Sequence, residues 1–219
     1  MCYLKKDYES DRLIWNLFSN AFRTIKSVYL FQNFQEYCRQ LNSDKQEDKL
    51  AVYWNASYYE KLIDYIKISV AFETFNKAIL LKKGIIVHKI DSKFNKELAK
   101  KQRDGFPINL TDFLKNNYSK LDFCKQKAEL NGFVDYFPTV NYSHTLNENY
   151  QKYIGLDKQL IFELQKINQK RNKLHFFTDF KGAFSVSDHI TKWNYIMENS
   201  IGIIESELKK ADEKLKNYA

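Results

Sequence analysis

Arg171 and His175 are the residues of this chain whose types and spacing best fit a chemical role. They stand four positions apart, in the stretch Arg-Asn-Lys-Leu-His, where a long amphipathic pattern ends. On a helix, side chains four positions apart share a face. An arginine keeps its positive charge at physiological pH, whereas a histidine exchanges a proton near neutrality. The pair therefore suggests phosphate chemistry. The alternative is an ordinary helix end whose cations interact favourably with the helix dipole.

A second pair of chemically capable residues, Glu73 and Lys77, lies in a segment rich in apolar residues. A glutamate four positions before a lysine is the favourable order for an ion pair on a helix. A charge in apolar surroundings needs a partner or must face a cavity. The pair indicates either support for a site or a half-exposed structural ion pair.

The remaining histidines give weaker signals. His144 and His189 lack the spacing of metal ligands, and the chain contains no H-E-x-x-H or C-x-x-C sequence. It also lacks a glycine-rich loop that could hold phosphates. We therefore expect neither a metal nor a cofactor, and we expect His88 to be structural.

Helices must position these residues, because the chain is poor in residues that form turns. Only 6 of its 219 residues are Gly and 2 are Pro, which is too few for the many turns of a β-rich chain. Apolar residues instead recur every three or four positions, as on the buried face of a helix. The sequence predicts an all-α fold, an up-and-down helical bundle of four to five major helices in a single domain, with a smaller helical insertion.

The first helices follow from the apolar periodicity and from start and stop signals. An N-terminal helix is predicted over 11–42, with Ser10 or Asp11 as its cap. A second helical pattern, in one helix or two, covers 46–83. Gly84 is expected to end it, because glycine readily takes the left-handed conformation that follows many helices.

The later elements include the segments that flank the candidate site. An extended run over 85–90 is expected first, followed by a basic insertion over 91–155. The last part of this insertion, 133–155, is a long connection or partly helical. A helix over 157–176, capped by Asp157, and a last helix over 188–217 complete the expected order.

The charge of the chain and its cysteine content indicate which binding partners and which cellular compartment to expect. The net charge is +8, from 35 Lys and Arg against 27 Asp and Glu, which fits a polyanionic partner or simply a basic soluble surface. Cys2, Cys38 and Cys124 are odd in number and lack metal spacing, so we expect reduced thiols in the cytoplasm. No apolar run is long enough for a membrane span, and the charged N-terminus does not fit a signal peptide.

Two of these segments together resemble the HEPN family of helical domains. The stretch A-x-E-x-x-x-K-A-x-L-L-x-x-G over 71–84, followed by His88, is similar to the second helix of that family. The R-N-x-x-H element over 171–175, before a long last helix, is similar to its catalytic motif. The segments occur in the order that the family requires.

The resemblance implies a metal-independent endoribonuclease, acting as a toxin or a defence effector and built as a homodimer. Its partners would be RNA and, for a toxin, an antitoxin protein. His175 would act as general base or acid, Arg171 would hold the scissile phosphate, and Asn172 would orient the phosphate or the imidazole. Glu73 and Lys77 would support this site.

Two other hypotheses remain open at this point. The family places four to six residues between the arginine and the histidine, whereas three separate Arg171 from His175. A helical side chain turns by about 100° for each residue of such a difference. The chain could therefore be a catalytically inactive HEPN-like module that binds RNA, a nucleotide or a partner protein. The third hypothesis is a helical interaction protein with a chance likeness to the motifs.

Overall fold

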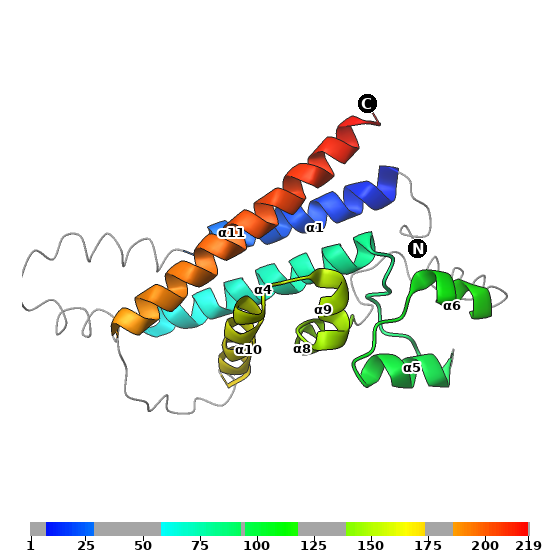
Figure 1. Ribbon diagram of the computed structural model, residues 1–219, viewed down its shortest axis with the longest axis horizontal. Coiled ribbons are helices and arrows are strands. Elements are labelled where there is room, and N and C mark those ends of the chain that lie inside the picture. Colours follow the sequence, from blue (N-terminus) through cyan, green and yellow to red (C-terminus); the bar gives the residue numbers. More distant parts are fainter. Residues whose placement is uncertain (1–7, 29–57, 93–94, 118–138, 174–185, 219) are drawn as a thin grey trace, which may run out of the picture. The chain divides into compact units, whose positions relative to one another are not determined.

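The computed structural model of the protein describes residues 8–28, 58–92, 95–117, 139–173 and 186–218 (Figure 1). Helices make up 78% of the described residues, and none of these residues forms a strand, so the predicted all-α class is confirmed. The helices of the described ranges are α1 (Tyr8–Lys26), α4 (Tyr58–Lys82), α5 (Lys96–Arg103), α6 (Leu110–Asn117), α8 (Tyr142–Thr145), α9 (Glu148–Ile154), α10 (Lys158–Lys173) and α11 (Val186–Lys216). In this part of the chain, no helix is long and apolar enough to cross a membrane.

The helices group into two compact units. The first unit contains Met1–Phe18, Phe75–Leu156 and Lys209–Ala219. The second unit contains Ser19–Thr74 and Asp157–Leu208. The first unit therefore holds the short helices α5, α6, α8 and α9, and the second holds α10 together with parts of α1, α4 and α11.

An extended segment links α4 to α5 in the first unit and divides the apolar side chains there between two clusters. Ile85 and Val87 pack with Leu80, Leu81, Val140 and Tyr150, whereas Ile86 packs with Ile108 and Phe113. This alternation is the pattern of an extended backbone, whose successive side chains point to opposite sides. The Ile86 N–H donates to Ile108 O (2.9 Å), and Val87 O accepts from Val140 N–H (2.8 Å). The extended run predicted over 85–90 is thus present up to the bridge between His88 and Thr139.

Gly84 ends the helical pattern of α4, as predicted. Its φ is 71°, in the left-handed region. The Gly84 N–H donates to Leu81 O (3.0 Å), and the Ile85 N–H donates to Leu80 O (2.8 Å). These are the two bonds of a Schellman motif, which satisfies the last carbonyls of a helix. The local signal was sufficient here because the motif involves only neighbouring residues.

The prediction of one continuous N-terminal helix over 11–42 is wrong at Ser27, because α1 ends at Lys26. The Ser27 hydroxyl donates to Thr24 O (2.8 Å), and the Thr24 hydroxyl donates to Asn20 O (2.8 Å). Such hydroxyl groups compete with backbone N–H groups for helix carbonyls. Residues 29–42 lie outside the described ranges.

The predicted caps Ser10 and Asp11 are also inside α1, which already includes Tyr8. Both side chains are buried. Asp11 accepts hydrogen bonds from Lys214 Nζ (2.7 Å) and from the Tyr218 hydroxyl (2.8 Å). Asp11 therefore joins the start of α1 to the end of α11 within the first unit, a long-range role that the local sequence does not reveal.

The segment 133–155, predicted as a long or partly helical connection, contains α8 and α9 in its described part. Asn147 caps α9, since its Oδ1 accepts from Tyr150 N–H (3.1 Å). Gly155 ends α9 with a φ of 78°. Asparagine and glycine are favoured at these two positions, so the helix is bounded by ordinary local signals. The insertion predicted over 91–155 thus includes four short helices in its described residues.

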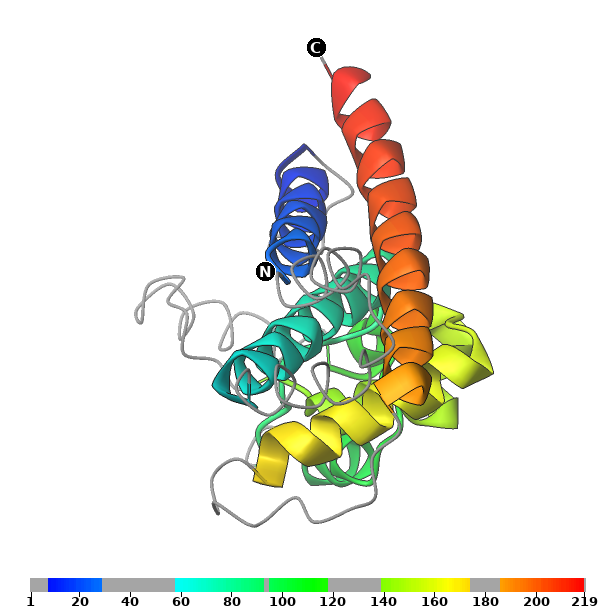
Figure 2. The same ribbon diagram turned by 90° about the vertical axis from the view of Figure 1, so that its left-hand side faces the viewer.

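In the second unit, α10 begins at the predicted cap. Asp157 Oδ1 accepts from the N–H groups of Gln159 (2.8 Å) and Leu160 (3.2 Å). The same atom accepts from the Tyr195 hydroxyl of α11 (2.8 Å), and this bond is the main reason why the pKa of Asp157 is lowered. In both views α10 lies beside the N-terminal part of α4 (Figure 1, Figure 2). Asp157 thus starts the helix that carries Arg171 and also connects it to α11.

Candidate functional site on the face between helices α4 and α10

Arg171 occupies the last described turn of α10, where it continues the buried face of that helix. The side chains of this face recur at intervals of four, three and four, at Leu160, Leu164, Ile167 and Arg171. The first three are buried and apolar. A charge at the fourth position needs a partner. The periodicity thus explains why the guanidinium points toward α4.

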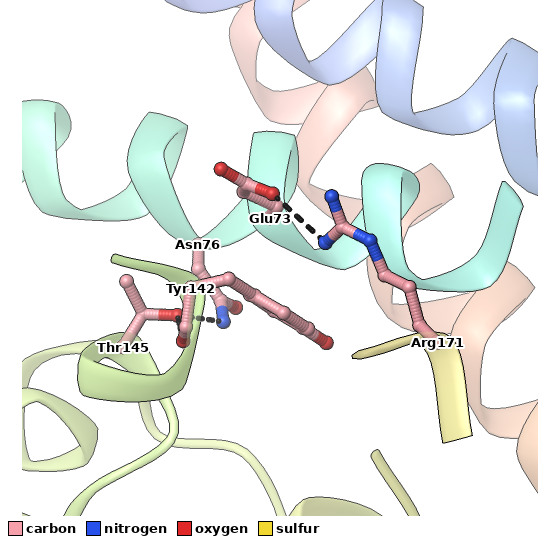
Figure 3. A network of polar contacts seen from close by, with 5 residues as sticks. All are labelled: Glu73, Asn76, Tyr142, Thr145 and Arg171. Atoms are coloured by element: carbon pink, nitrogen blue, oxygen red, sulfur yellow. Dashed lines mark hydrogen bonds and ion pairs between the residues drawn. The ribbon is translucent and has the colours of Figure 1, made fainter. Parts of the chain in front are cut away.

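The partner is Glu73 of α4. Arg171 Nη1 lies 3.4 Å from Glu73 Oε2, and the two side chains are 32% and 26% exposed. Figure 3 shows the guanidinium of Arg171 directed at the Glu73 carboxylate. The distance is long for a charge-assisted hydrogen bond, and both groups remain accessible to water. The pair is therefore loose, and a competing anion can reach the guanidinium.

The structure describes the positions of only some of the remaining predicted site residues. Asn172 is exposed at the end of α10. His175 lies outside the described residues. Lys77 is half-buried on α4, and its ion pair with Glu73 stays a prediction. The structure thus brings together Glu73 and Arg171, one residue from each of the two motifs.

A second contact between α4 and α10 was missed by sequence reasoning. Lys170 Nζ donates to the Tyr65 hydroxyl (3.3 Å) and lies 5.0 Å from the centre of its ring. Burial lowers the pKa of Lys170 and raises the pKa of Tyr65 to about 12. Burial thus favours the neutral amine and the neutral phenol. The residue types and their spacing carry no signal for this contact.

Two acids of the second unit are buried beside lysines of their own helices. Glu163 of α10 lies 3.2 Å from Lys166 Nζ, and Asp64 of α4 lies 3.3 Å from Lys67 Nζ. Both carboxylates are nearly inaccessible to water. Glu163 also opposes the lowering of the pKa of Lys170. The α4–α10 face therefore carries charges of both signs, and each needs its partner.

Asn76 belongs to a separate polar contact in the first unit. Its Nδ2 donates to Thr145 Oγ1 (3.0 Å), and the Thr145 hydroxyl donates to Tyr142 O (2.7 Å) (Figure 3). The Oδ1 atom of Asn76 is buried and has no hydrogen-bond donor within the described ranges. The contact fixes α8 to the C-terminal part of α4.

His88 and His144 lie in the first unit, and His88 has a structural position. Its backbone carbonyl accepts from Gln102 Nε2 (2.8 Å). Burial lowers the pKa of its imidazole, with a smaller contribution from nearby positive charge that includes Lys77. The side chain is therefore mainly neutral at pH 7. Among the described residues, no group of three or more His, Cys, Asp or Glu could hold a metal ion.

Comparisons with known proteins returned no matching protein-family model, no matching curated protein and no matching solved structure. The functional argument accordingly depends on the chemistry and geometry of the side chains.

Proposed function

We propose that the protein is a metal-independent endoribonuclease of HEPN type, with Arg171, Asn172 and His175 as its catalytic residues. The observation that supports this proposal is the contact between Glu73 and Arg171, which are 98 positions apart in the chain. These residues belong to the two segments that carry the resemblance. A chance likeness of two separate segments gives no reason for their charged residues to meet.

The proposed reaction is transfer of the RNA phosphate to the neighbouring 2′-oxygen. His175 takes the proton of the 2′-hydroxyl, the 2′-oxygen bonds to phosphorus, and the bond from phosphorus to the 5′-oxygen breaks. The leaving 5′-oxygen takes up a proton from water or from the protonated His175, and the products are a 2′,3′-cyclic phosphate and a 5′-hydroxyl. DNA lacks the 2′-hydroxyl, so it is not cleaved.

Arg171 stabilises the negative charge that accumulates on the phosphate oxygens during this reaction. A guanidinium carries five N–H donors in a planar fork. The contact with Glu73 uses the Nη1 group. Arg171 can therefore bind Glu73 and a phosphate together, and Glu73 acts as a positioning residue for the guanidinium. Lys77 is a further supporting residue in this proposal.

The proposed biological setting comes from the resemblance. In this proposal the enzyme cleaves cellular RNA in the cytoplasm as a toxin or a defence effector, and an antitoxin protein restrains it if it is a toxin. We include a homodimer in the proposal because the resembled family builds its RNA-cleaving site from two copies.

The test is cleavage of labelled RNA in the presence of EDTA. Wild type is compared with Arg171→Ala and His175→Ala, and with Arg23→Ala and His144→Ala as matched controls. We expect the first two variants to lose roughly 100-fold or more in rate, as is usual when an acid–base or phosphate-binding group is removed. Wild type that cleaves none of a varied set of RNAs would overturn the proposal, as would His175→Ala with full activity.

The second candidate function is an inactive module that binds RNA, a nucleotide or a partner protein. The observation that favours it is the interval of three residues between Arg171 and His175, against four to six in the resembled family. RNA binding that weakens steeply with salt, together with the absence of cleavage, would favour this candidate. RNA cleavage that depends on His175 would exclude it.

A further inference from the structure

Helix α5 of the first unit carries a stripe of positive charge. Lys96, Lys100 and Arg103 stand at intervals of four and three, so they lie on one face of the helix. All three are exposed. Leu98 and Gln102 occupy the opposite face, where Leu98 packs against an apolar cluster and Gln102 is buried. The stripe therefore faces solvent along the whole helix, over about 10 Å.

Helix electrostatics explain only part of the charge of α5. Helix α5 contains four cations and one acid, whereas α6, also eight residues long, contains one of each. Cations in the last turn of a helix are favoured by its dipole, but a cation in the first turn is disfavoured. Lys96 stands at the first position of α5. An external anion is a better explanation for the complete stripe.

Several polar contacts hold α5 in a fixed position. Asn95 caps the helix, since its Oδ1 accepts from Leu98 N–H (3.0 Å). The buried amide of Gln102 donates to His88 O (2.8 Å) and accepts from Ile90 N–H (2.8 Å). The helix is therefore joined to the extended segment that precedes it, and the cations are presented from a rigid support.

An exposed aromatic ring follows the helix directly. The Phe106 side chain is 44% exposed. Its backbone is anchored on both sides, because its N–H donates to Lys101 O (3.1 Å) and its carbonyl accepts from the Tyr150 hydroxyl (3.5 Å). An exposed phenylalanine at a fixed position offers a flat apolar surface on which a nucleic acid base can stack.

We propose that α5 and Phe106 form a binding surface for single-stranded RNA. Lys96, Lys100 and Arg103 contact consecutive phosphates, and the Phe106 ring stacks on an unpaired base. Cations at regular intervals beside an exposed ring match the repeated phosphates and bases of a single strand, so the combination favours RNA. The surface deepens the proposed function, on which it rests, by assigning the residues that hold the RNA strand.

The test measures binding of a fluorescent single-stranded oligouridylate by anisotropy, using the full chain with His175→Ala so that the RNA stays intact. The triple variant Lys96→Ala, Lys100→Ala, Arg103→Ala is compared with the control triple Arg12→Ala, Arg23→Ala, Lys26→Ala, which removes equal charge from exposed positions of α1. We expect the α5 variant to bind at least about ten-fold more weakly, with the slope of log K against log salt reduced by about 2. The control should keep the wild-type slope.

Phe106 supplies a second, independent measurement. Phe106→Ala should weaken binding by about ten-fold, because loss of one stacked base has an effect of this size. Its salt slope should stay unchanged, and Phe106→Trp should restore affinity. Equal weakening by the two triple variants would overturn the proposal, as would competition by polyglutamate that matches competition by RNA.

The results of these experiments can distinguish failure of the proposed RNA-binding surface from failure of the proposed cleavage activity. Binding that depends on α5, in a wild-type protein that cleaves no RNA, would overturn the proposed enzyme and leave the surface in place. RNA cleavage by the α5 triple variant with wild-type KM would overturn the surface and leave the enzyme in place.

Discussion

The short helices of the first unit and the α4–α10 face of the second unit use polar side chains in different ways. Around the short helices, neutral amides bond to backbone groups: Gln102 joins α5 to residues 88 and 90, and Asn147 caps α9 and donates to Gly105 O (3.0 Å). In the second unit, charged and phenolic groups meet between helices, as in the contacts of Arg171 with Glu73 and of Lys170 with Tyr65.

The difference has a physical consequence for stability and for chemistry. An amide that satisfies a buried backbone group stabilises one conformation of a turn, and its loss leaves that group unpaired. A partly buried charge costs desolvation energy, which its partner only offsets. The short helices are therefore suited to rigid presentation of a surface, and the α4–α10 face to groups that can exchange protons or bind an anion.

The largest stability effect is expected at Gly105, where the amide contacts of the first unit converge. Gly105 has a φ of 84°, and a Cβ there would lie 2.7 Å from Asn147 Nδ2. Gly105→Ala should lower the free energy of unfolding by about 2–3 kcal/mol, from the left-handed backbone and from loss of the Asn147 cap. Urea denaturation measures this change.

Gly84→Ala is the matched control, because its φ is 71° and an added Cβ would meet nothing within 4 Å. It should lose only the backbone part, about 1 kcal/mol. Equal losses at the two glycines would show that the Asn147 contact does not stabilise the first unit.

An intermediate effect is expected from Tyr65 at alkaline pH. Its pKa is 10.0 in the unfolded chain and about 12 in the folded protein, because burial disfavours the phenolate. Between these values the folded state binds more protons, so stability should fall as pH rises from 10 towards 12, by roughly 2 kcal/mol. Tyr65→Phe should flatten this fall in urea denaturation across the pH range.

Tyr153→Phe is the control, since Tyr153 is exposed. A slope that is as steep in Tyr65→Phe as in wild type would contradict the role assigned to the buried phenol of the second unit.

The smallest stability effect is expected at the candidate catalytic arginine. The Arg171–Glu73 pair is long and accessible to water, and exposed pairs of this kind contribute about 1 kcal/mol or less. Arg171→Ala should therefore unfold at nearly the wild-type urea concentration even though we expect it to lose cleavage activity. A stability loss as large as that of Gly105→Ala would make Arg171 a structural residue and would remove the contrast between the units.

Local signals in the sequence correctly predicted several element boundaries. Gly84 and Asp157 each act on groups within four residues, so their roles follow from residue type and position. The same reasoning failed for Asp11, whose partners Lys214 and Tyr218 are more than 200 positions away in the chain. It also missed the end of α1 at Lys26, where the Ser27 and Thr24 hydroxyl groups bond to helix carbonyls.

In the candidate site too, local features follow from the sequence, whereas contacts between distant residues do not. The sequence by itself determined the helical class, several helix boundaries and the two segments that resemble HEPN motifs, because periodicity and capping are local properties. Tertiary structure decided that Glu73 meets Arg171, that Lys170 lies against Tyr65, and that Gln102 connects α5 to the segment before it. These pairings depend on how helices pack, and a side chain gives no local sign of which distant group will satisfy it once both leave water.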